Sequence, residues 1–241
     1  MKILLLRLLL TTCVVASLPA SASEFSVTPV RIFMNAGERA VAITLTNEGD
    51  DDVVMQAELF TWKQKATGED DLVPTEDMIL SPSIVKLAPK ARQVVRLARL
   101  SPPPAGAEQT FRMIVREIPE AKPQSKELKL QVALAFSLPV FVTPPGAKRQ
   151  LVCSPERAAA DTVKVTCRND GTAYAQARGF ALVADGGDKL AARDTGGYIL
   201  PNVTRTFDVK RSEGRIPAGR LKVQVTLDDG SVQTFDGALA D

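Results

Sequence analysis

Histidine is absent from the 241-residue sequence, and aromatic residues make up only 5% of it. Histidine is the general base of Ser-His-Asp and Cys-His nucleophilic sites, so its absence excludes both, and it also removes the commonest metal ligand. Acidic runs occur at 50–52 and 69–71, but each lies in polar sequence beside Gly49 or Gly68, where solvated turns are usual. We therefore predict a protein that is not an enzyme and that uses no cofactor and no metal.

Long apolar runs are also missing after the first residues of the chain. Residues 1–22 contain Lys2 and Arg7, then an apolar stretch from Leu8 to Leu18, then the small residues Ala20-Ser21-Ala22. This order is typical of a signal peptide, and its apolar stretch is shorter than the roughly 20 residues that span a bilayer. We predict a signal peptide at 1–22 and an exported protein without membrane insertion.

A strong excess of charge of either sign is lacking. The chain has 30 Lys and Arg against 28 Asp and Glu, and two of the basic residues lie in the predicted leader. Proteins that bind nucleic acid or anionic membranes need an excess of positive charge to neutralise phosphates. The sequence therefore argues against nucleic acid and anionic membranes as partners.

Cysteine is scarce, with three residues, of which Cys13 falls in the predicted leader. Cys153 and Cys167 remain in an exported protein, where thiols oxidise. They have neither the CxxC spacing nor the further ligands that a redox or metal pair needs. We predict that they form a disulfide between two consecutive strands.

Apolar residues alternate with polar ones almost throughout, and convincing helical periodicity is missing. Such short alternating runs, separated by turn residues, indicate an all-β chain of antiparallel sandwiches. Pro144-Pro145-Gly146 breaks the pattern, so we predict two domains, at 23–143 and 144–241. The predicted strands are 41–45, 53–62, 84–87, 93–97, 110–118 and 128–138 in the first domain, and 150–154, 162–168, 175–184, 204–209, 222–227 and 233–235 in the second.

Three segments carry a resemblance to a known family. They are FSVTPVRIF at 25–33, LAPKARQVVRL at 87–97 followed by FRMIVREIP at 111–119, and LQVAL at 130–134 leading to PVFVTP at 139–144. In order and spacing, these segments resemble the periplasmic chaperones of the chaperone-usher pathway, which assemble pili. The likeness covers most of residues 25–145 and is weaker in the second domain.

The resemblance implies two immunoglobulin-like domains in a boomerang arrangement, located in the periplasm. In this family, the chaperone inserts one of its strands into a pilus subunit that lacks its own last strand, which is donor-strand complementation. The subunit groove would otherwise expose unpaired backbone and apolar core. The complex is then delivered to an outer-membrane usher, so pilus subunits and the usher are the expected partners.

The donor strand is expected in the segment 128–138, where large apolar residues occupy every even position. All of them therefore point to one side of the strand. The alternative is that this side packs in the protein's own core, which is the usual meaning of such alternation. The residues expected to enter the subunit groove are Leu130, Val132 and Leu134, with Leu128 and Phe136 as extensions of the contact.

Cations in the cleft of these chaperones hold the subunit's C-terminal carboxylate, and the resemblance assigns this role to Arg31. The family's second cation, a lysine, would fall near Ser137 or Pro139, where this chain has no positive charge. Arg112 and Arg116 are candidates, because both lie on the face of their strand opposite to Phe111, Met113 and Val115. The alternative is that both arginines form structural ion pairs.

Another class of function remains open from the sequence, namely an exported structural sandwich such as a pilus subunit or an adhesin module. Subunits are normally single incomplete domains, so two complete series of strands argue against it. The sequence also argues against a hydrolase, because histidine and the glycine pattern of a nucleophile elbow are both missing.

Overall fold

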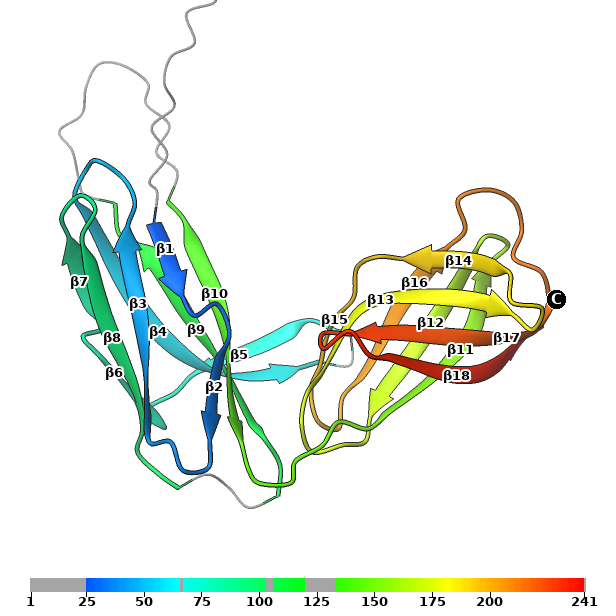
Figure 1. Ribbon diagram of the computed structural model, residues 1–241, viewed down its shortest axis with the longest axis horizontal. Helices are drawn as coiled ribbons and strands as arrows, with labels where there is room; N and C mark the ends of the chain where they lie inside the picture. Colours follow the sequence, from blue (N-terminus) through cyan, green and yellow to red (C-terminus); the bar gives the residue numbers. More distant parts are fainter. Residues whose placement is uncertain (1–24, 66, 103–105, 120–132, 241) are drawn as a thin grey trace, which may run out of the picture.

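The fold is described from a computed structural model and covers residues 25–65, 67–102, 106–119 and 133–240. These residues form strands, turns and loops, and none of them forms a helix that could cross a membrane. Figure 1 shows two lobes set at an angle to each other. The predicted signal peptide at 1–22 lies outside the described residues.

The first lobe contains ten strands in two sheets. One sheet has the order β1-β3-β8-β6, and the other has the order β2-β10-β9-β4-β5, with β7 paired to β4. The strand pairs are antiparallel, except that β2 and β10 run parallel. The strands are β1 (Phe25–Thr28), β2 (Ile32–Asn35), β3 (Ala40–Asn47), β4 (Val53–Gln64), β5 (Asp70–Pro74), β6 (Met78–Ser81), β7 (Ile84–Leu87), β8 (Arg92–Arg99), β9 (Gln109–Glu117) and β10 (Ala135–Thr143).

The second lobe contains eight strands and follows the turn at Pro145-Gly146. Its smaller sheet has the order β11-β12-β16, and its larger sheet has the order β14-β13-β17-β18, with β15 paired to β13. All of its pairs are antiparallel. The strands are β11 (Leu151–Ala159), β12 (Thr162–Asn169), β13 (Ala175–Ala184), β14 (Lys189–Arg193), β15 (Gly197–Ile199), β16 (Thr204–Lys210), β17 (Gly219–Leu227) and β18 (Val232–Leu239).

Each lobe has its own apolar core between its two sheets. The period-two pattern accounts for it, because alternate residues of a strand point to the same face. In β9, Phe111, Met113 and Val115 face the core of the first lobe, and in β12, Val163 and Val165 face that of the second. Burial of each such side chain contributes on the order of 1.5–3 kcal/mol, so each lobe has its own source of hydrophobic stabilisation.

The predicted all-β fold with two immunoglobulin-like sandwiches is confirmed, while the predicted domain boundaries stay predictions. Six short strands were not predicted, namely β1, β2, β5, β6, β14 and β15. They are three to five residues long, and several include charged or turn-forming residues, as in the sequence DDLVP of β5. Alternation cannot be recognised over so few positions, so neighbouring strands decide where they form.

Both ends of the strand predicted at 128–138 differ from the structure. Strand β10 begins at Ala135, so the described residues Ala133 and Leu134 lie outside it, and it continues through Pro139 to Thr143. Residues 128–132 lie outside the described part of the chain. A proline is tolerated in a strand at an edge, where one side has no partner. At Pro139, β10 has β9 beside it, and pairing with β2 begins only at Val140.

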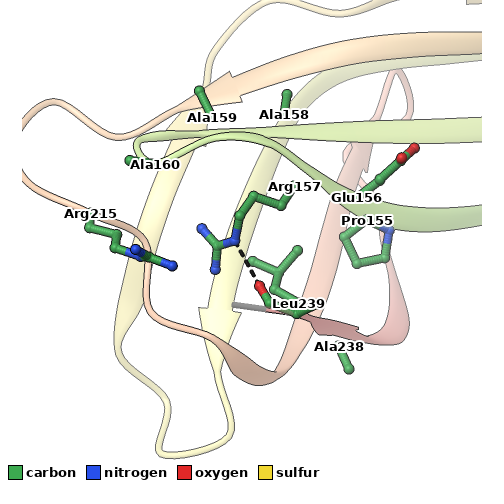
Figure 2. Close-up of a pocket in the computed structure, with 10 residues that line it drawn as sticks. Pro155, Glu156, Arg157, Ala158, Ala159, Ala160, Arg215, Ala238 and Leu239 are labelled. Atoms are coloured by element: carbon green, nitrogen blue, oxygen red, sulfur yellow. Dashed lines mark hydrogen bonds between the residues drawn. The ribbon is translucent and has the colours of Figure 1, made fainter.

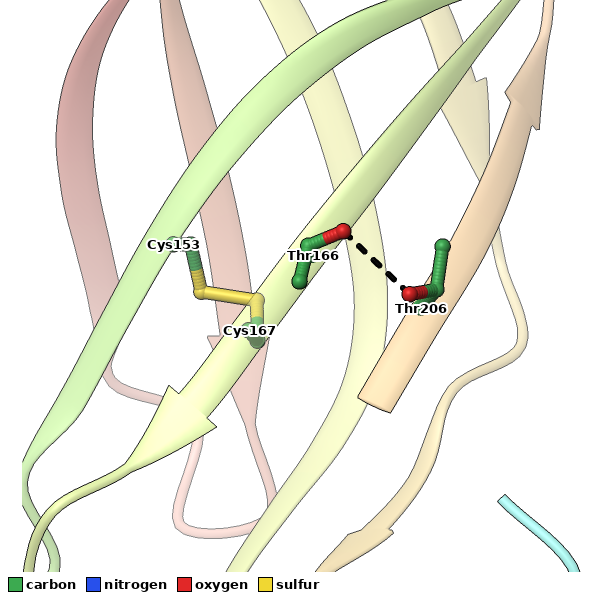
Figure 3. Close-up of a disulfide and its surroundings, with 4 residues drawn as sticks. All are labelled: Cys153, Thr166, Cys167 and Thr206. Atoms are coloured by element: carbon green, nitrogen blue, oxygen red, sulfur yellow. Dashed lines mark hydrogen bonds between the residues drawn. A yellow bond between two sulfur atoms is a disulfide. The ribbon is translucent and has the colours of Figure 1, made fainter. Parts of the chain in front are cut away.

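The predicted disulfide is present between Cys153 of β11 and Cys167 of β12 (Figure 3). The two cysteines lie directly opposite each other in the strand pair, with their Cα atoms 4.1 Å apart. Both belong to the core of the second lobe. On the outer face of the same sheet, the hydroxyls of Thr166 and Thr206 form a hydrogen bond of 3.2 Å. The disulfide therefore joins the first two strands of this lobe, as expected.

Candidate functional site

The N-terminal part of β10 is an open sheet edge in the described structure. Residues Ala135–Pro139 pair with β9 on one side, and the strand on the other side, β2, pairs only with Val140–Thr143. The backbone on that side of Ala135–Pro139 has no strand partner among the described residues. Such an edge offers N–H and C=O groups to another chain, and pairing at an open sheet edge is a recurring mode of recognition.

An apolar face continues along β10 beyond the core. Leu138 and Val140 are buried in the first lobe, whereas Phe136 earlier in β10 and Leu134 just before the strand are each 38% exposed. Phe136 makes an edge contact with Phe25, at a ring-centroid distance of 4.9 Å. Thus the strand carries apolar side chains out of the core at the same place where its edge is open. Of the predicted donor residues, Leu128, Leu130 and Val132 lie outside the described residues.

Arg31 lies immediately before β2 and reaches the second lobe. Its Nη1 donates hydrogen bonds to Asp228 Oδ2 at 3.0 Å and to Gln176 Oε1 at 3.1 Å. Partial burial works to lower the pKa of Arg31, but Tyr198, Asp228 and Tyr174 together outweigh it and raise the pKa above its ordinary value. The side chain is therefore always charged, and it remains 33% exposed.

Arg112 of β9 lies at the same junction of the lobes. Its Cζ atom is 3.7 Å from the centre of the Trp62 ring and 5.5 Å from that of Tyr198, and its Nη2 is 3.3 Å from Asp70 Oδ2. Burial lowers the pKa of Arg112, although Asp70 and Tyr198 oppose this effect. Arg112 is the register partner of Pro139 in β10. Arg112 therefore lies across the strand pair from one of the two positions at which the family's lysine was expected.

Arg116, the other predicted candidate, has a different environment. Its Nη2 is 2.7 Å from Glu58 Oε2 on β4, and the side chain is 45% exposed. Arg116 is the register partner of Ala135, at the other end of the open edge. The structure thus brings Arg31 and Arg112 together beside Tyr198 and separates Arg116 from them. The ion pairs of Arg112 and Arg116 agree with the alternative interpretation, so the cleft role of each stays a prediction.

The lobes meet in an aromatic cluster that the sequence did not identify. Trp62, Phe141 and Leu200 are buried there, and Tyr174 and Tyr198 pack against them. The rings of Phe141 and Tyr174 are stacked, with centroids 3.9 Å apart. The cluster includes the single tryptophan and both tyrosines of the sequence. The rarity of these two residue types was therefore the signal in the sequence that could have pointed to the junction.

Polar contacts reinforce this junction. The side-chain amide of Gln64, at the end of β4, donates to the carbonyl of Tyr198 at 3.1 Å and accepts from the N–H of Leu200 at 3.0 Å. Glu108 accepts from the N–H of Tyr174 at 3.0 Å and from the Thr143 hydroxyl at 2.8 Å. Burial raises the pKa of Glu108, although both hydrogen bonds oppose the rise. In Figure 1 the β4–β5 hairpin reaches across to β15.

A separate cavity lies at the end of the second lobe, between the end of β11 and the C-terminal part of β18 (Figure 2). Arg157 lies in it, with Nε donating to the carbonyl of Ala240 at 2.7 Å and Nη1 to that of Ile216 at 3.0 Å. The guanidinium thus ties the end of the chain to the lobe. Among the described residues, no group of His, Cys, Asp and Glu side chains could hold a metal ion.

The chain is similar to a known protein family and to proteins of known role. A family model described as pili and flagellar-assembly chaperone, PapD N-terminal domain, matches residues 24–148. A curated relative, the chaperone protein FimB/FhaD of Bordetella pertussis, is 29% identical over 149 residues. That alignment includes 59% of this chain and 58% of the relative, so less than two thirds of the relative's length is covered.

Solved structures resemble the whole described fold. A chain in the CsuC–CsuE chaperone–tip adhesion subunit pre-assembly complex of Acinetobacter baumannii matches with a TM-score of 0.66 and 22% identity, covering 91% of this chain and 100% of that one. A chain in the Salmonella enterica complex of the SafA pilin with the SafB chaperone matches with a TM-score of 0.58 and 15% identity, covering 91% and 98%. At these identities, the likeness shows the shared two-sandwich fold.

Proposed function

The chain belongs to the family of pili and flagellar-assembly chaperones, and from this premise we propose that it binds pilus subunits in the periplasm, stabilises them by donor-strand complementation and delivers them to an outer-membrane usher. The family consists of non-enzymatic chaperones, and this chain acts by binding alone. The observation that carries the proposal is the open edge of β10 at Ala135–Pro139, beside the exposed apolar side chains of Leu134 and Phe136.

Strand addition at this edge has two sources of binding energy. Backbone hydrogen bonds form between the subunit and the side of β10 that has no strand partner, and the apolar face of β10 enters the subunit groove. Each large apolar side chain that becomes buried contributes on the order of 1.5–3 kcal/mol. The predicted donor residues Leu128, Leu130 and Val132 precede this stretch directly and extend the same alternation.

Arg31 supplies the carboxylate anchor in this proposal. A guanidinium binds a carboxylate through two parallel, charge-assisted hydrogen bonds, and partial burial strengthens them. Arg31 remains charged and partly exposed at the junction of the lobes. Arg112 provides the second positive charge from β9, beside Tyr198.

The test is a capture experiment with tagged protein from the periplasm of cells that express a chaperone-usher gene cluster. The wild type is expected to yield a one-to-one complex with a pilus subunit, and Arg31→Ala is expected to fold but recover little subunit. Arg39→Ala, which changes an arginine before β3, is the matched control and retains binding. Capture of no subunit by the wild type, or polymerisation of the chain itself as a pilus subunit would do, contradicts the proposal.

A further inference from the structure

One corner of the Arg31 guanidinium is bound by the second lobe. Nη1 donates to both Asp228 and Gln176. Tyr198 is a further hydrogen-bonding neighbour of Arg31, and a third of the Arg31 side chain is exposed. The guanidinium is therefore held at Nη1, while part of it remains open to a ligand.

Asp228, in the turn after β17, is itself firmly held. Its side chain is only 12% exposed. Oδ2 accepts a hydrogen bond from the Tyr174 hydroxyl at 3.3 Å, and Oδ1 accepts one from Arg149 Nη1 at 3.4 Å. The backbone N–H of Asp228 donates to the carbonyl of Gln176 at 3.1 Å. A carboxylate fixed by a cation, a hydroxyl and its own backbone fixes in turn the arginine that it binds.

We propose that Asp228 is the positioning residue of the carboxylate anchor: it binds Nη1 of Arg31 and so presents the open part of the guanidinium to the C-terminal carboxylate of the bound subunit. This inference rests on the proposed function and deepens it. The second lobe thereby takes part in the recognition of the subunit's chain end, through a residue that does not touch the subunit.

The charge environment of Asp228 favours a role in positioning Arg31 over competition with the subunit's carboxylate for Arg31. Asp228 is paired with two cations, because Arg149 contacts it on the side away from Arg31. Arg149 also pairs with Asp229, so these four groups are neutral together, and the attraction for an incoming carboxylate comes from the exposed part of the Arg31 guanidinium. The bidentate geometry of an arginine and a carboxylate needs a fixed guanidinium plane, and a contact at Nη1 provides it without using the other nitrogens.

The experiment uses synthetic peptides that copy the last residues of the captured subunit, with either a free carboxylate or an amide at the C-terminus. Their binding to the full-length protein is measured by calorimetry for the wild type, Asp228→Ala and Asp228→Asn. We expect Asp228→Ala to weaken the carboxylate peptide about tenfold and to leave the amide peptide unchanged, because only the carboxylate uses the positioned nitrogens. Asp228→Asn keeps an oxygen that can accept from Nη1, so it retains most of the affinity.

Several outcomes overturn the inference. Equal weakening of both peptides by Asp228→Ala means a structural role alone, and tighter carboxylate binding means that Asp228 competes with the ligand. Equal binding of both peptides to the wild type means that Arg31 does not bind the peptide's C-terminal carboxylate.

Gln176→Ala provides a second variant if Asp228→Ala does not fold, because it removes the other acceptor of Nη1. We expect this variant also to weaken the carboxylate peptide and to leave the amide peptide unchanged. Failure of the wild type to capture any subunit instead contradicts the proposed function, so the two failures are distinguishable.

Discussion

Arg112 lies over the indole ring of Trp62, with its Cζ atom 3.7 Å from the ring centre. A cation in this position is attracted to the electron-rich face of the ring, and the contact holds the guanidinium at the junction of the two lobes. Arg112 is opposite Pro139 in the β9–β10 pair, so its positive charge lies beside the strand on which the family's lysine was expected.

Replacement of Arg112 by alanine is therefore expected to reduce the affinity for a subunit, by about tenfold if its charge contacts the terminal carboxylate. Arg116→Ala is the matched control on the same face of β9, where the arginine pairs with Glu58 outside the junction. Calorimetric titration of the two variants with one subunit measures the difference. Equal losses for both variants would show that neither arginine has a special role in the cleft.

A charge on the exposed apolar face beside β10 is expected to prevent subunit binding and to leave the free protein folded. Leu134→Asp makes this change at a side chain that is 38% exposed. Val152→Asp in β11, which is 48% exposed in the second lobe, is the control. Circular dichroism and capture of a subunit measure the two effects. If Leu134→Asp unfolds the free protein, this face belongs to its own core and the donor assignment fails.

Loss of the disulfide is expected to weaken the second lobe selectively. The two cysteines are 14 positions apart in the sequence, and closure of a loop of about this size contributes on the order of 3 kcal/mol to the free energy of unfolding in the chain-entropy model. Urea unfolding of the double variant Cys153→Ser and Cys167→Ser, followed by circular dichroism, measures the loss. A transition of the first lobe that shifts as far as that of the second would refute the selectivity.

Alkaline pH is expected to destabilise the fold through Tyr174. Burial, followed by the nearby Asp228 carboxylate, raises the pKa of its hydroxyl to about 12. The folded state thus holds this proton more tightly than the unfolded chain, whose tyrosine pKa is about 10. The contribution of the protonated Tyr174 hydroxyl to the free energy of unfolding is complete below a pH of about 10 and is lost as the pH rises through about 12.

Tyr174→Phe removes this titration and serves as the comparison. The urea midpoint of the wild type is expected to fall more steeply with pH than that of the variant across the alkaline range. The fluorescence of Trp62, the single tryptophan, reports the transition from within the junction. If the urea midpoints of the wild type and Tyr174→Phe fall equally with pH, the loss of stability at alkaline pH does not come from Tyr174.

The sequence was sufficient where a strand is long and regular. Alternation identified the cores, as in Phe111, Met113 and Val115, and the two cysteines of a chain predicted to be exported indicated their bond. It was insufficient where distant segments meet. Nothing in the local sequence around Asp228 indicates that it binds Arg31, since the contact depends on how the two lobes pack. The sequence did not predict the aromatic cluster around Trp62 for the same reason, because its residues come from β4, β10 and the second lobe.

The central claim is that β10 lends its open edge to a subunit, and amide hydrogen exchange along this strand tests it most directly. Peptides that cover Ala135–Pro139 are compared between the free protein and its complex with a captured subunit, and β12 of the second lobe serves as the internal control. We predict that exchange at Ala135–Pro139 slows strongly in the complex, because the subunit's backbone pairs with the open edge, while exchange in β12 stays the same. Unchanged exchange at Ala135–Pro139 in a stable complex would contradict the account.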